Sequence, residues 1–385
     1  MSEWKTVILN DVLDILIDYR GKTPDKKTSG VALITAKIVK NGAIEKPSEF
    51  IAEEDYKDWM TRGIPEIGDV VLTTEAPLGE VAQLKYNHVA LAQRIILLRG
   101  KKNILDNSFL KYYLQSYKGQ QILKNRESGT TVTGIKQSEL RKIEIDCPDF
   151  QTQRRIVDLL SCLDDKLDLN NRINGNLEQQ TQAIFKEWFV DHAKPEWKEG
   201  KFTDLIDILG GGTPGTNEVS YWNGTIPFFT PKDVSTSCYI FSTEKNITED
   251  GLHHCNSRLY PPETVFITAR GTVGKVAIAG TSMAMNQSCY ALQGKGCGQL
   301  FTYYETLNIV KILQNKANGA VFDAITTCDF ESENIVIPDT EMLTKFEEKV
   351  KPLHTMMKNN CRENIRLEQI RNAILPKLMK GEINI

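Results

Sequence analysis

The strongest constraint on the fold is an internal repeat, because the second half of the chain restates the first half at a shift of about 190 residues. Trp4 recurs as Trp197, and "LGEVA" at 78–82 recurs as "VGKVA" at 273–277. Further matches continue along both halves, each of which ends in a long stretch with helical periodicity. The chain is therefore expected to contain two copies of one structural unit.

Each copy is predicted to contain a compact α+β domain followed by a long helix. A chain of 385 residues is too long for one ordinary core, which favours two or three domains. Short β-rich runs such as "DVVLTT" and "TVFITA" alternate with Gly and Pro turns and with helical stretches. We expect domains at 1–148 and 195–337, and long helices at 149–194 and 338–385.

The two predicted helices carry apolar residues at heptad spacing, and the stripe of each is interrupted by two asparagines. These are Asn170 and Asn174 in the first copy, and Asn360 and Asn364 in the second. In an antiparallel pair, Asn170 meets Asn364 and Asn174 meets Asn360. A slip in register would bury an amide without a partner, at a cost of roughly 1 to 3 kcal/mol. The asparagines therefore predict a register-locked antiparallel coiled coil with an internal pseudo-twofold repeat; the alternative is two unrelated amphipathic helices.

Such a helix pair has the properties of a ruler. Helices of roughly 40 residues form a rod of about 60 Å, and we expect one domain displaced toward each end. Two similar but diverged domains at a fixed separation suit a target with two dissimilar features at a fixed spacing. A DNA duplex is such a target.

Composition excludes several other classes of protein. No apolar run approaches the roughly 20 residues of a membrane span, and the amino-terminal residues lack the features of a signal peptide. We therefore expect a cytoplasmic protein with no membrane partner. The eight cysteines include no C-x-x-C pair, which favours free thiols. His253, His254 and Cys255 could begin a metal site, but adjacent histidines point apart and no second ligand pair is nearby. We expect no metal and no cofactor.

The net charge of −3 argues against a chain that coats nucleic acid along its whole surface. The charge is nevertheless uneven, because nine basic residues and one acid lie between Lys85 and Arg126. This segment is interpreted either as a groove for a polyanion or as a solvated helix face with a loop.

Several segments together resemble a known family. They are "GGGTPGTNEVSYWNGTIPFFTPKDV" at 210–234, "ARGTVGKVAI" at 269–278, "NQSCYAL" at 286–292, "PDFQTQRRIVDLLSCLDDKLDLN" at 148–170 and "ILPKLMKGEI" at 374–383. In this order and with the long helices between them, they closely resemble the specificity subunit of Type I restriction-modification systems. The resemblance covers essentially the full chain.

The resemblance implies a non-catalytic, sequence-specific DNA-binding subunit. Each domain would be a target-recognition domain that reads one half of a bipartite, asymmetric site in double-stranded DNA. The helices would dock two methyltransferase subunits, and two ATP-driven restriction subunits would join the full complex. Adenine methylation and DNA cleavage would belong to those other subunits.

Candidate DNA contacts are polar residues in loops bounded by Gly or Pro, where they can reach phosphates or base edges. The first domain lacks the "YW" pair of the second, so contacts are not transferred from one domain to the other. The candidates are Arg20, Lys22, Thr23, Thr74, Lys136 and Gln137 in the first domain, and Thr213, Tyr221, Lys232, Arg270 and Lys275 in the second.

Two other functions remain as alternatives: a stand-alone DNA-modifying or DNA-cleaving enzyme, and a coiled-coil scaffold that binds only protein. The single Pro-Pro, at 261–262, lacks the flanking residues of an adenine methyltransferase motif. Pro338, Asp339 and the run Glu347 to Lys349 outline a metal-dependent nuclease, but they fall in the predicted heptad helix. A scaffold gives no reason for diverged loops on duplicated domains.

Overall fold

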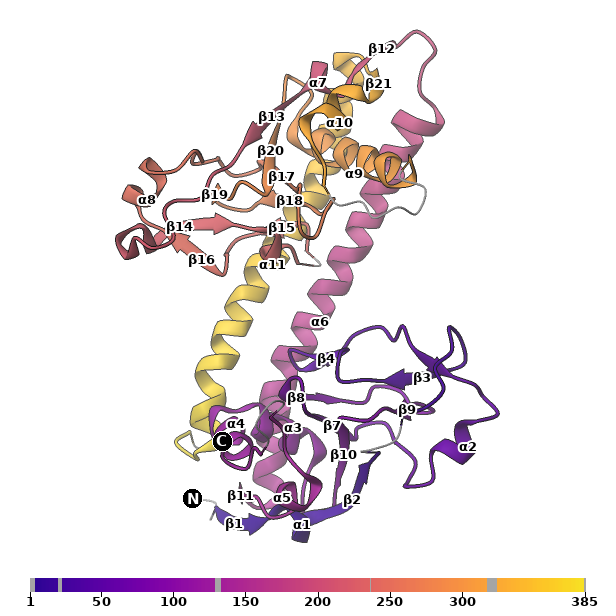
Figure 1. Ribbon diagram of the computed structural model, residues 1–385, viewed down its shortest axis with the longest axis vertical. Coiled ribbons are helices and arrows are strands. Elements are labelled where there is room, and N and C mark those ends of the chain that lie inside the picture. Colours follow the sequence, from indigo (N-terminus) through magenta and orange to yellow (C-terminus); the bar gives the residue numbers. More distant parts are fainter. Residues whose placement is uncertain (1–3, 20–22, 129–132, 236, 317–323, 384–385) are drawn as a thin grey trace. The chain divides into compact units, whose positions relative to one another are not determined.

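The computed structural model describes residues 4–19, 23–128, 133–235, 237–316 and 324–383, and the chain divides into two compact units. Unit 1 comprises Met1–Asp165 with Leu367–Ile385, and unit 2 comprises Lys166–Arg366. Each unit contains one α+β domain and a segment of both long helices (Figure 1). The predicted fold class is therefore confirmed.

The first domain is built on a four-stranded antiparallel sheet with the strand order β2-β10-β7-β8. Its strands are β2 (Leu13–Asp18), β10 (Ile95–Gly100), β7 (Val70–Thr74) and β8 (Leu78–Gln83). Helices α3 (Asn107–Gln115) and α4 (Tyr117–Asn125) pack against it. All five residues of "VVLTT" in β7 are buried, as expected for a β-branched strand in the middle of a sheet.

The second domain repeats this sheet and adds one strand, in the order β13-β20-β17-β18-β15. The strands are β13 (Ile206–Gly210), β20 (Cys289–Gly294), β17 (Val265–Thr268), β18 (Val276–Ala279) and β15 (Tyr239–Ile240). Helix α9 (Gln299–Lys316) packs on this sheet where α3 packs in the first domain.

Each domain carries a second small sheet, which in the first domain shares one apolar core with Ile17, Val71 and Leu97 of the four-stranded sheet. In the first domain it contains β3 (Val31–Ile34), β6 (Phe50–Ile51) and β9 (Ala90–Leu91); in the second it contains β14 (Trp222–Phe229), β16 (Lys245–Ile247) and β19 (Ala284–Met285). In Figure 1 the second of these sheets forms, with α8 (Glu249–His253), a lobe on the side of the domain opposite α9.

The remaining elements are short. Two-stranded sheets pair β1 (Lys5–Ile8) with β11 (Glu144–Cys147), β12 (Lys198–Lys201) with β21 (Asn334–Ile337), and β4 (Val39–Lys40) with β5 (Ala43–Ile44). The short helices are α1 (Leu9–Val12), α2 (Tyr56–Trp59), α5 (Gln137–Leu140), α7 (Phe202–Leu205) and α10 (Thr327–Ser332), with 3₁₀ turns at Val219–Tyr221 and Pro231–Asp233.

The predicted repeat is confirmed at the level of single hydrogen bonds. In the first domain Glu80 N donates to Thr73 Oγ1 at 3.0 Å. In the second, Lys275 N donates to Thr268 Oγ1 at 2.9 Å. Both pairs are matched by the same shift of 195 residues that aligns "LGEVA" with "VGKVA".

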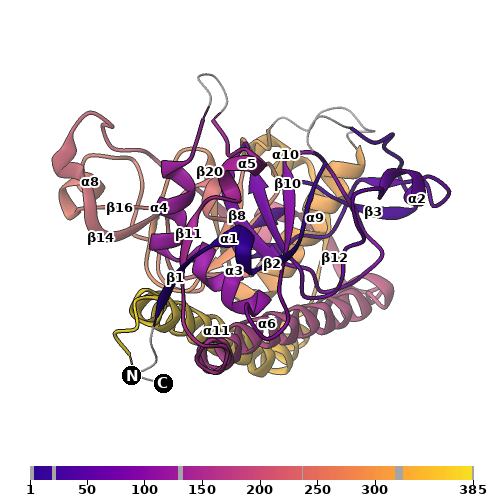
Figure 2. The same ribbon diagram turned by 90° about the horizontal axis from the view of Figure 1, so that it is seen from below.

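The long helices are α6 (Phe150–Lys186), which continues as a π-helical turn at Glu187–Asp191, and α11 (Thr340–Met379). Asp149 and Asp339 cap them: Thr152 N donates to Asp149 Oδ1 at 3.0 Å, and Met342 N donates to Asp339 Oδ1 at 2.8 Å. Hydrogen bonds from Trp197, Met342 N and Lys194 lower the pKa of Asp339 to about 2. The helices lie side by side (Figures 1 and 2).

The asparagine layers form as predicted, both within unit 2. Asn170 Nδ2 donates to Asn364 Oδ1 at 2.9 Å, and Asn360 Nδ2 donates to Asn174 Oδ1 at 2.8 Å. This crossed pairing requires antiparallel helices. Asn170 is fully buried, and its Oδ1 accepts no hydrogen bond from the described residues. The unpartnered oxygen is a cost of the observed register, whereas the two amide–amide hydrogen bonds are what a slipped register would lose.

Asp164 on α6 anchors the first domain to its helices. It accepts hydrogen bonds from Tyr112 Oη at 2.7 Å and Lys111 Nζ at 3.3 Å on α3, and from Arg371 Nη1 at 2.9 Å on α11. Burial acts to raise the pKa of Asp164, but the Tyr112 hydrogen bond and the charges of Lys111 and Arg371 outweigh it and hold that pKa below its usual value. The first anchor is an ionic network.

His354 on α11 anchors the second domain, at the position that the repeat matches to Asp164. Its Nε2 lies 2.9 Å from Tyr304 Oη on α9, and its Nδ1 lies 3.1 Å from Tyr239 Oη on β15. Burial lowers the pKa of His354 to about 4. Because the imidazole is then neutral, one ring nitrogen donates and the other accepts. The imidazole of the second anchor is neutral, although Tyr239 Oη also donates to the carboxylate of Glu263 at 3.3 Å.

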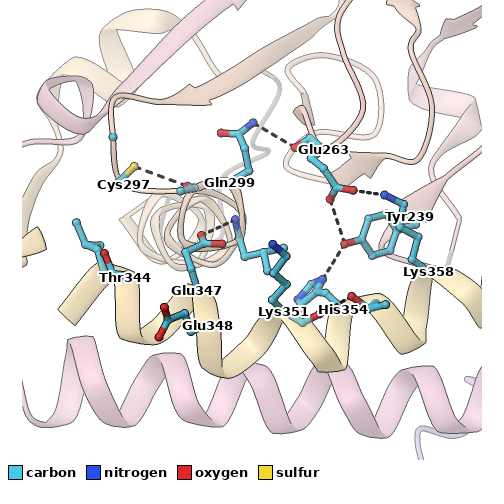
Figure 3. A pocket seen from close by; sticks show the side chains of 15 residues that line it. Tyr239, Glu263, Cys297, Gln299, Thr344, Glu347, Glu348, Lys351, His354 and Lys358 are labelled. Carbon is cyan, nitrogen blue, oxygen red and sulfur yellow. Dashed lines mark hydrogen bonds and ion pairs between the residues drawn. The ribbon is translucent and has the colours of Figure 1, made fainter. Parts of the chain in front are cut away.

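Next to His354 lies a cavity of about 570 Å³, also lined by Glu263, Glu347 and Lys358 (Figure 3). Glu347 on α11 accepts hydrogen bonds from the backbone N–H groups of Leu300 and Phe301, both at 2.9 Å. A carboxylate from one helix thus caps the amino terminus of another, where the helix dipole favours negative charge. This contact fixes α9, and hence the second domain's sheet, on α11.

Candidate nucleic-acid interface

In the second domain, four loops meet at one end of the main sheet. Gly212 N donates to Met285 O at 3.1 Å, Asn286 N donates to Phe229 O at 3.0 Å, and Ala269 N donates to Ser288 O at 2.8 Å. These bonds connect the loops 211–216, 230–233, 269–275 and 286–288, which we call the second loop cluster. The loops are separated in the sequence and are brought together by the strand order of the sheet.

The second loop cluster contains four of the five residues predicted for this domain. Lys232, Arg270 and Lys275 are exposed there, and Thr213 is half-buried with its hydroxyl hydrogen-bonded to Gln287. The cationic side chains therefore share one surface with a polar pair, an arrangement that can contact both phosphates and base edges.

Tyr221 lies beside the same loops. Its ring stacks on His254 with centroids 4.9 Å apart and planes 16° apart. An added Cβ at Gly215 would lie 3.9 Å from its Cε2 atom. Tyr221 thus lies next to the 211–216 loop and carries a half-buried aromatic ring.

Close packing fixes the shape of the 211–216 loop. A Cβ at Gly211 would lie 2.2 Å from Asn286 O, and a Cβ at Gly212 would lie 2.6 Å from Asn256 N. Both distances are shorter than van der Waals contact with backbone atoms that cannot easily move. Glycine is required at these positions because another backbone occupies the space of a side chain.

The first domain has a corresponding first loop cluster, made by residues 74–78, 93–94 and 133–137. Thr74 N donates to Arg94 O at 2.9 Å, and Ile135 N donates to Thr74 O at 3.1 Å. Lys136 is exposed here, and Gln137 is half-buried at the start of α5. The structure thus brings these two predicted residues to the same end of the sheet.

The other four residues predicted to contact DNA in the first domain add no exposed side chain to this cluster within the described part of the chain. Thr74 is only 3 % exposed at the end of β7, so its side chain is not presented to a ligand, and the prediction that it contacts DNA is not supported. Thr23 is exposed, between the main sheet and the small one in the sequence. Arg20 and Lys22 lie outside the described residues.

Three residues of the loop clusters were missed as candidates. Arg94 and Gln287 are exposed, and Gln93 is half-buried. A signal was available, because Gln93 and Gln287 correspond in the repeat and a polar residue retained between two diverged copies in a Gly/Pro-bounded loop is a reason to test it.

The basic segment between Lys85 and Arg126 does not form a single cationic groove. Arg99 pairs with Asp69 at 2.7 Å, and Lys111 pairs with Asp164 at 3.3 Å; their side chains are 14 % and 13 % exposed. Lys118 pairs with Asp146, and Arg126 pairs with Glu139 at 3.1 Å. These charges stabilise the domain internally, whereas Arg94 is the member of the segment in the first loop cluster.

Three other kinds of feature would bear on function in the described part of the chain: metal-ligand groups, disulfides and membrane-spanning helices. No three His, Cys, Asp or Glu residues within it are grouped to hold a metal ion. All eight cysteines are free thiols, with five buried and Cys162 and Cys328 exposed. None of its helices combines the length and apolar character that crossing a bilayer requires.

A model of the "Type I restriction modification DNA specificity domain" matches the chain twice, over residues 1–179 and 194–369. The two matches follow the internal repeat and cover most of the chain. The protein belongs to this family. The specificity subunits of Type I restriction-modification systems thus share with it two target-recognition domains and paired long helices.

Individual specificity subunits are similar over nearly the whole chain. The MjaIX subunit of Methanocaldococcus jannaschii is 25 % identical, over 100 % of this chain and 94 % of its own length. The HindI subunit of Haemophilus influenzae is 23 % identical, over 77 % of this chain and 82 % of its own. The crystal structure of a Type I S subunit from M. genitalium matches with a TM-score of 0.59, covering 98 % and 96 % of the two chains at 16 % identity. The last likeness shows that the fold is shared.

Proposed function

We propose that this specificity subunit selects the DNA site of a Type I complex by reading a bipartite, asymmetric sequence in double-stranded DNA. The first loop cluster would contact one half-site and the second loop cluster the other. The recognition domains correspond to residues 1–148 and 195–337. The chain contributes no catalytic group in this proposal, and adenine methylation and DNA cleavage take place on partner subunits.

One observation carries the proposal: the two loop clusters share a backbone framework but differ in side chains. Equivalent hydrogen bonds join Thr74 N to Arg94 O in the first domain and Ala269 N to Ser288 O in the second. On this framework the second domain places Arg270 and Lys275, where the first has Glu75 and Glu80. Similar scaffolds with different polar surfaces suit two different base sequences.

The helices are proposed to set the spacing between half-sites and to dock two methyltransferase subunits, with two restriction subunits joining the full complex. Support comes from the paired asparagine layers, which fix the register of α6 against α11. A fixed register gives a fixed helix length between the domains, which a flexible linker would not. The cytoplasmic location expected from the sequence stays a prediction.

The spacing role is tested by inserting one heptad into each long helix beside the asparagine layers, with a and d positions apolar so that the seam stays in phase. Seven residues add about 10 Å of helix, which corresponds to about three base pairs at 3.4 Å each. The variant is co-expressed with the methyltransferase subunit from the same source, and methylated adenines are mapped by sequencing. We expect unchanged half-sites with a spacer longer by about three base pairs, and lower activity because the half-sites also rotate around the duplex.

The unmodified chain, co-expressed in the same way, is the control and must yield a two-part methylated motif. An active variant with the original spacer would show that the helices do not measure the site. A control without any two-part motif would instead favour the alternative of a protein-binding scaffold.

A further inference from the structure

In each loop cluster, the strand-end residue that is hydrogen-bonded to two other loops (Thr74 or Ala269) marks a corner of the cluster. Each corner contains an arginine, but the two arginines come from different loops. Ile135 N donates to Thr74 O at 3.1 Å, and Ile325 N donates to Ala269 O at 2.9 Å. Thr74 thus corresponds to Ala269, and the next residues, Glu75 and Arg270, correspond to each other.

Across the same corner, the second pair of matched residues also differs. The carbonyls of Arg94 and Ser288 accept equivalent hydrogen bonds, from Thr74 N at 2.9 Å and from Ala269 N at 2.8 Å. The first domain therefore combines Glu75 with Arg94, whereas the second combines Arg270 with Ser288. The guanidinium is present in both corners although its position in the sequence is not retained.

The Arg94 side chain is available to a ligand and lies beside a carboxylate. It is 50 % exposed, and its Nε lies 3.6 Å from Glu75 Oε2, a carboxylate that is 23 % exposed. Its terminal Nη atoms make no hydrogen bond within the described part of the chain. Arg94 also has φ of +71°, a conformation that costs energy for any residue with a Cβ and that the Thr74 hydrogen bond maintains.

We propose that Arg94, which lies beside Glu75, reads a guanine in the first half-site, and that Arg270 reads a guanine in the second from the corresponding part of its loop cluster. The inference rests on the proposed function. A guanidinium can donate two parallel hydrogen bonds to O6 and N7 of guanine in the major groove, which is the commonest base-specific contact that proteins make. Glu75 lies 3.6 Å from Nε, at ion-pair distance, and the two Nη groups remain for the base.

The test compares Arg94→Ala, Arg94→Lys and Arg270→Ala in the full chain, co-expressed with its methyltransferase, with adenine methylation mapped over the host genome. We expect Arg94→Ala to lower methylation at the original sites by about 5- to 150-fold relative to sites with another base at one position of the first half-site. Arg94→Lys should also relax that position, since lysine keeps the charge but not the fork. Arg270→Ala should relax one position of the second half-site only.

Lys118→Ala is the matched control, because Lys118 is also a surface cation of the first domain, 44 % exposed and paired with an acid that is 22 % exposed. It should leave both half-sites unchanged. The inference is overturned if Arg94→Ala and Arg94→Lys keep every position of the first half-site, or if they lower methylation equally at all sequences. If the unmodified chain gives no two-part motif, the proposed function itself fails, and that result is distinct from either outcome.

Discussion

The two domains are attached to their helices at equivalent positions by different side chains, a carboxylate in unit 1 and a neutral imidazole in unit 2. Asp164 holds Lys111, Tyr112 and Arg371 in an ionic network, whereas His354 lies as a neutral ring between two tyrosine hydroxyls. The backbone around both anchors follows the same repeat. The duplicated fold thus fixes the position on the helix at which each domain is attached, but it leaves the type of anchoring side chain free to differ. The two attachments should therefore respond differently to mutation and to pH.

The largest expected effect is the loss of the ionic anchor. Asp164→Ala leaves Lys111 and Arg371, 13 % and 29 % exposed, without their shared carboxylate. Breaking a partly buried charge network in this way should cost about 2 to 3 kcal/mol of unfolding free energy in unit 1. Hydrogen-exchange mass spectrometry should show faster exchange in α3 with no change in α9. The exposed neighbour gives the control, Asp165→Ala, and equal effects of both substitutions would remove the anchor role.

The next effect concerns pH and unit 2. The folded pKa of His354, about 4, lies below the value of about 6.5 for an unfolded histidine. The unfolded state therefore binds the proton more tightly, and stability is complete above pH 6.5 and is lost as the pH falls toward 4. Between pH 7.5 and pH 5 the loss should be about 2 kcal/mol.

Other groups of unit 2 titrate in the opposite sense. Burial raises the pKa of Glu305 to about 7 and also raises the pKa of Glu347, so protonation of these carboxyls adds stability over the same range and offsets part of the His354 loss. Tyr239 and Tyr304 have pKa values raised by burial, and Glu263 is paired with Lys358. Asp164 in unit 1 has a lowered pKa and stays ionised over the same range. The His354 contribution is therefore measured by comparing hydrogen exchange of unit 2 in the unmodified protein and in His354→Gln, which can hydrogen-bond but not titrate, at both pH values. Between pH 7.5 and pH 5 the unmodified protein should lose about 2 kcal/mol more stability than His354→Gln, and an equal response of the two proteins would contradict the prediction.

The smallest effect is expected at Lys111, which the second domain replaces with Thr302. Lys111 lies 3.8 Å from the centre of the Tyr112 ring, and burial lowers its pKa despite the charge of Asp164. Since burying a cation offsets much of what its ion pair gains, Lys111→Met should change stability by less than about 1 kcal/mol. Urea unfolding of the two proteins tests this, and a loss as large as that of Asp164→Ala would show that the lysine is an essential part of the anchor.

The sequence predicted the features that follow from periodicity. The repeat gave the two domains, and the heptad pattern placed Asn170 against Asn364 and Asn174 against Asn360. Register in a helix pair depends on residue spacing along each helix, which a sequence displays directly. The caps at Asp149 and Asp339 are local in the same sense, because each contacts residues only three positions away.

The sequence could not predict features that depend on distant segments meeting. Lys111 counted as part of a basic field because its partner, Asp164, lies far along the chain. Thr74 was selected for its polarity, although its place at the end of a central strand buries it. Arg94 is not among the predicted contacts because its proximity to Glu75 arises only when the sheet assembles.

The two glycines at 211 and 212 limit how this protein can acquire a new target. Any side chain there would displace the backbone at Asn286 or Asn256. Mutation of either glycine should therefore disrupt the fold of the loop before it can alter which bases are recognised. Substitutions are better tolerated at exposed neighbours in the same loop, such as Thr216. A lineage that changes its preferred DNA can therefore explore new side chains on an unchanged loop, and its intermediates remain folded while it does so.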